Sequence, residues 1–276
     1  MARILVTDDD ATTRQMVRGI LKNAGHAVTT ASDGVAALRA IHKKKFDLVL
    51  LDIWMPKMTG MGLLGSLHGE KYIPKIIVMT SDATSDTLLN ALRGRVYQFV
   101  HKPLEADSLL AVVENALSTS PEIPAIEVLS ANKHWVELLV PCERSVVSRV
   151  QSFLTHLETD LPADVLEKVG YAFRELLNNA IEWGGHLDPN LKVRISYIRT
   201  KKLLMYRLDD PGPGFKLEDL KHAAVNNPAS DPMAHMQVRE EKGLRPGGLG
   251  LMLTKQLVDE LVYNELRNEV VLIKYL

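Results

Sequence analysis

The first 118 residues alternate short apolar runs with segments whose apolar residues recur at helical spacing. Apolar runs this short are typical of strands buried on both faces of a parallel sheet, and the clearest are 3–7, 46–51 and 75–79. Helical periodicity covers the segments between them, at about 12–23, 34–43, 84–93 and 105–117. Repeated strand–helix units predict an α/β domain over residues 1–118.

The pattern changes where two prolines and several small polar residues follow residue 118, and this composition predicts a linker over 119–130. After the second proline, Pro124, the pattern predicts a hairpin, two helices, two strands, an irregular stretch, a helix and a last strand. Their ranges are about 125–129, 135–140, 143–158, 162–183, 191–198, 203–209, 211–246, 248–261 and 269–275. This order predicts a second domain over 131–276, an α+β fold with helices on one face of a mixed sheet.

Composition narrows the class of protein. A hydrophobic content of 46% and a charged content of 24% describe a globular chain, and a net charge of −1 gives no general attraction for nucleic acid or anionic membrane. The one cysteine, Cys142, excludes an internal disulfide and suits a reducing compartment. The first residues lack a signal pattern, and no apolar run reaches the roughly 18 residues of a membrane span. We therefore expect a soluble cytoplasmic protein without DNA or membrane as partner.

Carboxylates follow two of the predicted strands. Asp8, Asp9 and Asp10 end the first strand, and Asp52 ends the strand that begins at residue 46. Ligands of open parallel sheets gather at the carboxyl ends of the strands, so we expect Asp8, Asp9 and Asp52 to share one pocket. Clustered carboxylates raise one another's pKa unless a cation is present, and oxygen ligands favour a hard ion such as Mg²⁺.

Two further strand ends carry a hydroxyl and an ammonium group, those of Thr80 and Lys102. In the same pocket they would hold the oxygens of a phosphoryl group on Asp52. Each residue alone is more simply a solvated loop position. The joint pattern favours a phosphate-accepting site.

Four segments together resemble a response-regulator receiver domain: Ile4-Leu-Val-Thr-Asp-Asp9, Asp52-Ile-Trp-Met-Pro-Lys-Met-Thr-Gly60, Met79-Thr-Ser81 and Phe99-Val-His-Lys-Pro103. The resemblance covers about 118 residues and implies a flavodoxin-like, doubly wound sheet of five parallel strands. It also implies that an upstream sensor histidine kinase supplies the phosphoryl group.

The resemblance also implies a role for each matched residue. Asp52 accepts the phosphate, while Asp8, Asp9, Asp52 and the Trp54 carbonyl hold Mg²⁺. Thr80 and Lys102 sense the phosphoryl group, and Phe99 takes the aromatic switch position. The family often has tyrosine there, and phenylalanine lacks the hydroxyl for a hydrogen-bonded readout.

In the second half of the chain, Glu175 and Asn179 stand four residues apart on a predicted helix, just beyond the edge of its apolar stripe. That spacing points both side chains the same way. A carboxylate and a carboxamide there suit a water molecule and a metal ion. A solvated helix shoulder is the simpler explanation if the pair is taken alone.

Two glycine-rich segments follow, Asp210-Pro-Gly-Pro-Gly214 after a strand and Gly247-Gly-Leu-Gly-Leu251 at the start of a helix. The aspartate can accept a hydrogen bond from an exocyclic amine, and glycines let the backbone approach a planar ring. Free amides at a helix N-terminus favour phosphate. Either segment alone also fits an ordinary turn. The chain has neither Gly-x-x-x-x-Gly-Lys-Ser/Thr nor Gly-x-Gly-x-x-Gly at these glycines, which excludes P-loop and Rossmann sites.

The three segments together resemble the histidine-kinase-like (GHKL) ATPases over about residues 130–276, and most closely the anti-sigma-factor serine kinase branch. The branch is indicated by Glu175-Leu-Leu-Asn-Asn-Ala-Ile-Glu-Trp-Gly-Gly185 and by Tyr263-Asn-Glu-Leu-Arg-Asn-Glu-Val-Val-Leu-Ile-Lys274. The likeness implies Mg²⁺ and ATP as cofactors.

The GHKL likeness implies that Asn179 binds Mg²⁺, Asp210 reads adenine, and Glu175 is the general base that activates a protein hydroxyl. Residues at the base and phosphates would be Gly212, Gly214, Gly248 and Gly250. The stretch 216–246 corresponds to the family's ATP lid. Lys242 and Arg245 near its end are candidates for the terminal phosphate or plain solvated charges. Trp183 stands where relatives often have histidine.

Three functions remain open. The first is a phosphorylation-controlled serine/threonine kinase that acts on an anti-sigma-antagonist-type partner or binds a sigma factor. The second is a non-catalytic ATP-dependent binding switch. The third is a rearranged sensor histidine kinase, for which His156 is the candidate phosphoacceptor. A homodimer is a further candidate partner. A DNA-binding output finds no helix-turn-helix or basic stripe to support it.

Overall fold

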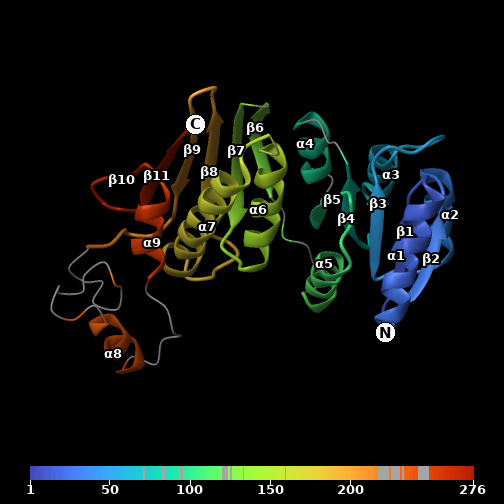
Figure 1. Cartoon of the computed structure of the whole chain (residues 1–276), viewed down its shortest axis with the longest axis horizontal. Coiled ribbons are helices and arrows are strands. Elements are labelled where there is room, and N and C mark those ends of the chain that lie inside the picture. The colour runs from blue at the N-terminus through green and yellow to red at the C-terminus, as the bar shows by residue number, and fades with distance from the viewer. Residues whose placement is uncertain are drawn as a thin grey trace. The chain divides into compact units, whose positions relative to one another are not determined.

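The computed structural model describes residues 1–70, 72–81, 85–93, 96–119, 124, 126–132, 134–158, 160–216, 224, 231, 233–241 and 249–276. The chain divides into two compact units (Figure 1). The first comprises residues 1–125 and 148–157, and the second comprises 126–147 and 158–276.

A parallel sheet of five strands, in the order β2-β1-β3-β4-β5, forms the first unit. The strands are β1 (Arg3–Thr7), β2 (Ala27–Ala31), β3 (Leu48–Asp52), β4 (Lys75–Thr80) and β5 (Gln98–His101). The helices are α1 (Ala11–Asn23), α2 (Gly34–Lys43), α3 (Gly60–Leu67), α4 (Ser85–Arg93) and α5 (Ala106–Ser118). α1 lies beside α5, and α3 contacts both α2 and α4. The predicted doubly wound parallel sheet is confirmed.

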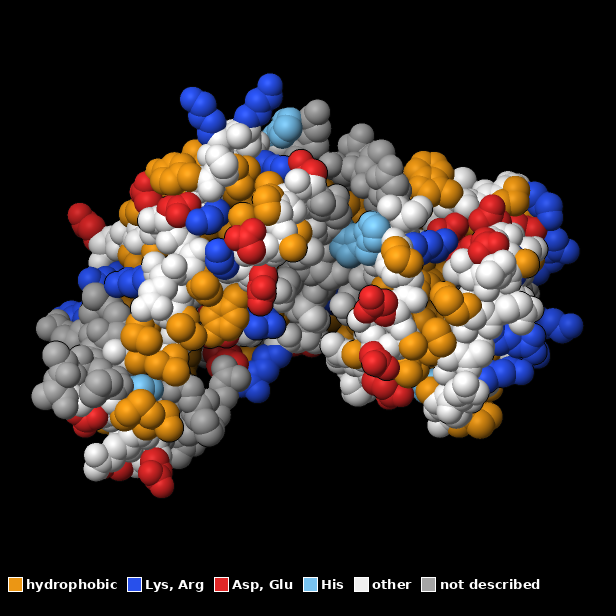
Figure 2. Space-filling view, in the orientation of Figure 1, with side chains coloured by type: hydrophobic (Ala, Val, Ile, Leu, Met, Phe, Trp, Pro, Cys, Tyr) orange, Lys and Arg blue, Asp and Glu red, His pale blue; other side chains and the backbone are white. Residues whose placement is uncertain are grey.

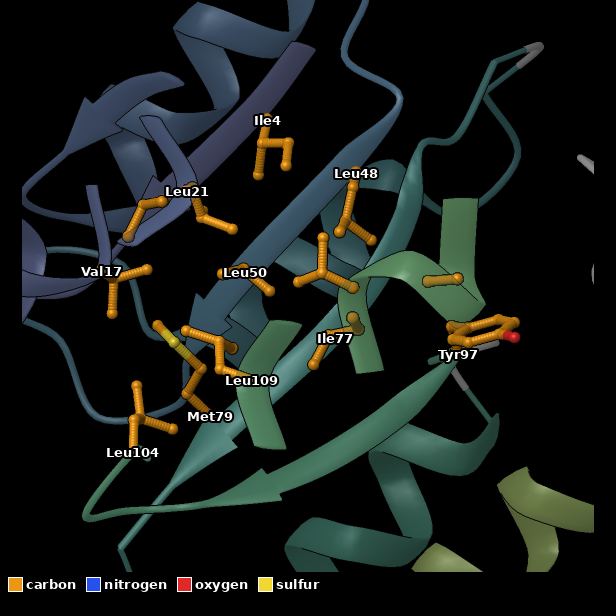
Figure 3. Packing of buried hydrophobic residues seen from close by; sticks show 13 residues of the cluster. Ile4, Val17, Leu21, Leu48, Leu50, Ile77, Met79, Tyr97, Leu104 and Leu109 are labelled. Atoms are coloured by element: carbon orange, nitrogen blue, oxygen red, sulfur yellow. The ribbon is translucent and has the colours of Figure 1, made fainter. Parts of the chain in front are cut away.

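Figure 3 shows the core between the sheet and one helix pair. Val17 and Leu21 of α1 and Leu109 of α5 point toward the strand residues Leu50 and Met79. All five are buried. The central strands are buried on both faces, which is why β3 reads as a continuous apolar run.

The second unit is built on a sheet of six strands in the order β10-β11-β9-β8-β7-β6, with antiparallel pairs throughout its described residues. The strands are β6 (Glu127–Asn132), β7 (Trp135–Pro141), β8 (Lys192–Arg199), β9 (Leu203–Asp209), β10 (Glu260–Tyr263) and β11 (Glu269–Tyr275). The helices are α6 (Ser145–Leu157, shared between the units), α7 (Ala163–Asn179), the π-helix η1 (Ala180–Gly184), α8 (Ala234–Glu241) and α9 (Gly250–Leu257). This arrangement confirms the predicted α+β fold.

The packing of α7 on the sheet follows from alternation along β9. Leu204, Tyr206 and Leu208 are buried, and the residues between them are more exposed. The ring of Phe173 from α7 lies 4.8 Å, centroid to centroid, from that of Tyr206. Period-two burial on the strand and an apolar helix stripe therefore meet at one face of the sheet.

The predicted helix over 248–261 is wrong at its end. α9 stops at Leu257, and residues 260–263 form β10, which pairs with β11 from Glu260↔Ile273 to Tyr263↔Val270. Asp259 holds this boundary because its carboxylate accepts from Lys274 Nζ at 2.8 Å. Pairing with a strand later in the sequence overrides the local helical pattern.

Smaller differences concern other element boundaries. α8 lies inside the stretch predicted to be irregular, and α3 was not singled out by the pattern. β6 (Glu127–Asn132) overlaps the strand predicted at 125–129 and begins inside the segment that was also predicted to be a linker. The predicted helix 162–183 is α7 followed by a π-helical turn.

Side chains of both charge signs are interspersed on the visible face of each unit (Figure 2). In the described part of the chain, no helix is long and apolar enough to cross a membrane.

Candidate phosphoacceptor and nucleotide sites

The ends of β1 and β3 bring three carboxylates together. β1 pairs with β3 in parallel, and Thr7 lies opposite Leu51, so the residues that follow each strand are neighbours. Oxygens of Asp8, Asp9 and Asp52 all lie within 4.8 Å of one another. Asp8 and Asp52 are buried, whereas Asp9 is exposed. The structure thus brings together the three carboxylates that the sequence pattern predicted to be neighbours.

Lys102 supplies the positive charge in this pocket. Its Nζ lies 2.8 Å from Asp8 Oδ2 and 2.9 Å from Asp52 Oδ1. Burial raises the pKa of Asp52, and Asp8 and Asp9 raise it further, while the Lys102 hydrogen bond acts against them. Burial alone would lower the pKa of Lys102, but its bonds to the two aspartates raise it overall. One ammonium group therefore faces three carboxylates, and the remaining negative charge suits a hard cation.

Asp10 has a different role from its two neighbours. Its carboxylate caps α1 by accepting the backbone N–H groups of Thr12 and Thr13, at 3.2 and 2.8 Å. The hydrogen bonds with Thr13 are the main reason that the pKa of Asp10 is lowered. The third aspartate of the run is thus a helix cap.

Arg14 is a residue that the sequence pattern did not reveal. Its Nη1 donates to the backbone carbonyls of Asp8 and Asp9, at 2.6 and 2.8 Å. The guanidinium group therefore fixes the loop that carries two of the three pocket carboxylates. A basic residue one turn into the helix after an acidic run is the signal that could have indicated it.

Thr80 and Trp54 complete the surroundings of Asp52. Thr80 ends β4 beside the end of β3, and its buried Oγ1 has no hydrogen-bond partner within the described chain. A buried hydroxyl without a partner is available to a phosphoryl oxygen. Trp54 follows β3 and has a largely exposed side chain. Thr80 thus follows the residue that is paired with Asp52, and Trp54 comes two residues after Asp52 in the chain.

Phe99 is buried in β5, an edge strand of the parallel sheet in the first unit. Its backbone carbonyl accepts the Ser152 hydroxyl at 3.1 Å, and its ring lies 5.6 Å from the His156 ring. Burial lowers the pKa of His156, and its Nε2 is enclosed. A phosphoacceptor histidine needs an accessible ring nitrogen, so this geometry argues against that role for His156.

Asp210 lies at the end of β9 in a tightly closed corner. Its Oδ1 accepts the Gly212 N–H at 2.9 Å. A Cβ on Gly184 would lie 2.2 Å from the same oxygen, so only glycine fits there. Burial is the largest cause that raises the pKa of Asp210, to about 6. The π-helix η1 places Gly184 against Asp210, and π-turns of this kind are frequent at functional sites.

Glu175, a residue of α7, lies against the start of α9. A Cβ on Gly250, the first residue of α9, would lie 2.2 Å from Glu175 Oε2. Asn179, one turn further along α7, is exposed. The continuous helix formed by α7 and η1 therefore contacts the Gly250 segment through Glu175 and the Asp210 turn through Gly184. These contacts are nine residues apart, about 14 Å along a helix, the length scale of an extended nucleoside triphosphate.

Gly212 and Gly214 lie in the turn after Asp210, and Gly250 is the first residue of α9. Gly248, Lys242 and Arg245 lie outside the residues that the structure describes. Cys142 is buried against Gly185, where a Cβ would lie 2.1 Å from its Sγ. Burial raises the pKa of the Cys142 thiol to about 11, as suits a packing residue.

Two family descriptions match separate parts of the chain. The response regulator receiver domain matches residues 4–114, and the histidine kinase-like ATPase domain matches residues 141–274. The DNA-binding response regulator MtrA of Mycobacterium tuberculosis is 32% identical over 183 residues, which cover 66% of this chain and 78% of MtrA. This chain belongs to the response-regulator family. It joins a receiver domain to a histidine-kinase-like ATPase domain, as the two resemblances predicted.

Other relatives of this response regulator match over the receiver domain. The nitrogen assimilation regulatory protein NtrX of Azorhizobium caulinodans is 31% identical over 118 residues, which are 42% of this chain and 26% of NtrX. Among solved structures, Vibrio cholerae CheY4 is 29% identical, with a TM-score of 0.40, and covers 42% of this chain and 99% of its own. The receiver domain of Brucella abortus NtrX is 37% identical, with the same TM-score and coverages.

Proposed function

We propose that Asp52 is the phosphoacceptor of this response regulator. Receiver domains accept phosphate from sensor histidine kinases, so the upstream partner belongs to that class. Two observations support the proposal: the Lys102 ammonium group lies 2.9 Å from the Asp52 carboxylate, and the buried Thr80 hydroxyl has no hydrogen-bond partner among the described residues. They are the groups that would hold the oxygens of an acyl phosphate.

The donor set fits Mg²⁺ at the same place. Asp8, Asp9 and Asp52 offer carboxylate oxygens within 4.8 Å of one another, and the Trp54 carbonyl is a further candidate ligand. When bound, the ion would neutralise charge on the phosphoryl oxygens. Arg14 would keep the Asp8 and Asp9 backbone in place, and Lys102 would hold one oxygen of the acceptor carboxylate.

We further propose that the output domain is an ATP-dependent protein serine/threonine kinase. The observation that carries this is the placement of Glu175 directly against Gly250, at the N-terminus of α9. Free amides at a helix N-terminus favour phosphate, so the carboxylate would lie beside the reacting end of ATP. A carboxylate there can take the proton from an attacking hydroxyl.

The remaining roles follow the same likeness to the ATPase family. Asp210 would accept the exocyclic amine of adenine, with Gly212 and Gly214 beside the base. Asn179 would hold Mg²⁺, and Gly250 would approach the phosphates. Gly248, Lys242 and Arg245 complete the proposed set, outside the described residues. The protein substrate would be of the anti-sigma-antagonist type.

Transfer of label from γ-labelled ATP to candidate antagonist-type proteins tests the kinase. The wild type should label a serine or threonine, and Glu175→Gln should lower the rate by at least about 100-fold, the range of a lost general base. Glu167→Gln is the matched control, an exposed glutamate two turns earlier on α7. ATP binding without any transfer would overturn the kinase proposal.

Asn179 is exposed, and a second candidate function is a binding switch that needs nucleotide but transfers no phosphate. A switch needs nucleotide but no base. Partner capture by a sigma factor or its antagonist should then survive Glu175→Gln and fail in Asn179→Ala. A kinase predicts that Glu175→Gln slows transfer by at least about 100-fold while ATP still binds.

A further inference from the structure

The turn between β10 and β11 packs against the segment that carries Asp210. The backbone N–H of Asp210 donates to the carbonyl of Asn268 at 2.9 Å. Five residues later, the N–H of Phe215 donates to the carbonyl of Leu266 at 3.1 Å. The turn, residues 264–268, therefore contacts both ends of the Asp210–Phe215 segment.

The side chain of Asn268 adds two bonds. Its Nδ2 donates to the carbonyl of Gly212 at 3.3 Å, and its Oδ1 accepts Asn264 Nδ2 at 2.8 Å. Asn264 is held in turn because its Oδ1 accepts the N–H of Glu269 at 3.2 Å. The bond from Asn264 orients the Asn268 carboxamide, so that the Asn268 NH₂ group faces Gly212 and the Asn268 Oδ1 faces Asn264.

The turn packs so closely against Gly214 that there is no space for a side chain at this position. Gly214 has φ +78°, and a Cβ there would lie 1.7 Å from the carbonyl oxygen of Leu266. Beyond it, the Phe215 ring lies edge-on to Tyr263 at 5.7 Å. Close backbone approach, hydrogen bonds and ring packing thus act on the same six-residue segment, Asp210–Phe215.

From these contacts we propose that Asn268 is a positioning residue of the nucleotide site. Its backbone carbonyl fixes the start of the segment, and its side chain fixes Gly212, whose N–H is bonded to the Asp210 carboxylate. Asn268 thereby sets the direction of the Asp210 oxygen that reads adenine. This inference rests on the proposed ATP binding and adds the residue that aims the adenine-reading carboxylate.

The test compares ATP with ITP, whose base has an oxo group in place of the adenine amine. Loss of aim should weaken the amine contact specifically, whereas general damage to the pocket should weaken both nucleotides equally. Dissociation constants for both are measured on the full-length wild type and on Asn268→Ala. We expect ATP to bind about tenfold more weakly to the variant, with ITP changed by less than about threefold.

Two further variants make the result decisive. Asn268→Asp keeps the volume and an acceptor for Asn264 but removes the donor to Gly212, so it should reproduce the loss of ATP preference. Asn132→Ala is the control, since Asn132 caps the β6–β7 turn at the opposite edge of the same sheet through bonds of 2.8 and 3.0 Å. It should bind ATP as the wild type does.

An unchanged ratio of ATP to ITP affinity in both Asn268 variants would overturn the inference while leaving ATP binding intact. An equal loss for both nucleotides would also overturn it, because that result describes a structural role alone. A wild type that binds no ATP would instead overturn the proposed function itself.

Discussion

The two candidate pockets each enclose an aspartate whose pKa is raised by burial, but they are built differently. Asp52 lies at the end of a parallel strand, and the ammonium group of Lys102 is 2.9 Å away. Asp210 lies in a turn, and its carboxylate accepts a backbone N–H from Gly212. Side chains at strand ends define the first pocket, whereas closely packed glycines define the second.

The difference matters for the chemistry that each pocket supports. A lysine beside the carboxylate keeps Asp52 ready to act as a charged nucleophile and to meet phosphoryl oxygens. A carboxylate held by a backbone amide is more sensitive to proton concentration, and the role we propose for Asp210 is recognition. The contrast suggests that the receiver pocket depends on charge and that the nucleotide pocket depends on shape.

The largest expected effect is that each of two substitutions abolishes or weakens the activity of one pocket and leaves the other pocket unchanged. Asp52→Asn should abolish phosphorylation by a small phosphodonor such as acetyl phosphate, since the nucleophile is gone, and should leave ATP affinity of the unphosphorylated protein unchanged. Asp210→Asn should weaken ATP about 100-fold, the upper range for a hydrogen bond to a charged group, and leave phosphorylation intact. Phosphoprotein electrophoresis and nucleotide titration measure the two effects. A variant that impairs both activities would contradict the separation of the pockets.

The second effect comes from filling the space beside each aspartate. Gly184→Ala would place a Cβ 2.2 Å from Asp210 Oδ1, and Gly60→Ala would place one 2.4 Å from the Asp52 backbone oxygen. Overpacking of this kind costs about 1–3 kcal/mol. We expect Gly184→Ala to impair ATP binding only and Gly60→Ala to impair phosphorylation only.

Gly65→Ala is the matched control for these glycine changes, since nothing lies within 4 Å of its Cβ position in α3. An alanine in a helix interior is favoured by about 0.5–1 kcal/mol, so this variant should be at least as stable as the wild type. Thermal unfolding measures the stability of the glycine variants, and the phosphorylation and ATP-binding assays measure their two activities. Equal losses for Gly65→Ala and Gly184→Ala would show that shape is not what the second pocket needs.

The same contrast between the two pockets explains which parts of each site could be predicted from the sequence. Asp8, Asp9, Asp52 and Lys102 could be placed together because strands in a parallel sheet end at one edge, so position along the chain determines position in space. The Asp210 corner depends on a π-helical turn that brings Gly184 against the carboxylate. No hydrophobic periodicity in the sequence predicts a π-helical turn, because tertiary packing determines where one forms.

The errors have the same origin. β10 was predicted as the end of a helix because its pairing partner, β11, comes later in the chain. Arg14 was missed because its role depends on folding back over the loop that precedes its own helix. Patterns within a segment predicted the elements and the acidic pocket, and contacts between segments decided the rest.

The third effect concerns pH. Burial raises the pKa of Asp210 from 3.8 to about 6, so the ionised acceptor is present above pH 6 and is lost as the pH falls through that value. Between pH 7 and pH 5 the ionised fraction falls about tenfold, and ATP affinity should fall by the same factor. Nucleotide titration across this range measures it. Asp210→Asn should bind weakly at every pH, and a wild type with constant affinity down to pH 5 would contradict the assignment of Asp210 as acceptor.

The smallest effect tests whether the receiver pocket depends on shape as well as charge. Arg14→Ala removes two hydrogen bonds that hold the carbonyls of Asp8 and Asp9, and it also removes a positive charge near the proposed Mg²⁺. Loss of the charge favours Mg²⁺ slightly, because water and salt screen it. Loss of the bonds, about 1 kcal/mol each, disfavours Mg²⁺. We expect the second effect to dominate and to weaken Mg²⁺ about threefold in calorimetric titration.

Arg14→Lys separates the two contributions, because lysine keeps the charge but has a shorter side chain than the one that brings Arg14 Nη1 to both carbonyls. It should bind Mg²⁺ at least as weakly as Arg14→Ala, whereas Arg18→Ala, one turn further along α1, should match the wild type. If Arg14→Ala binds Mg²⁺ more tightly and Arg14→Lys is unchanged, charge alone governs this pocket. The two aspartate pockets would then differ even more sharply than their geometry indicates, one tuned by electrostatics and the other by fit.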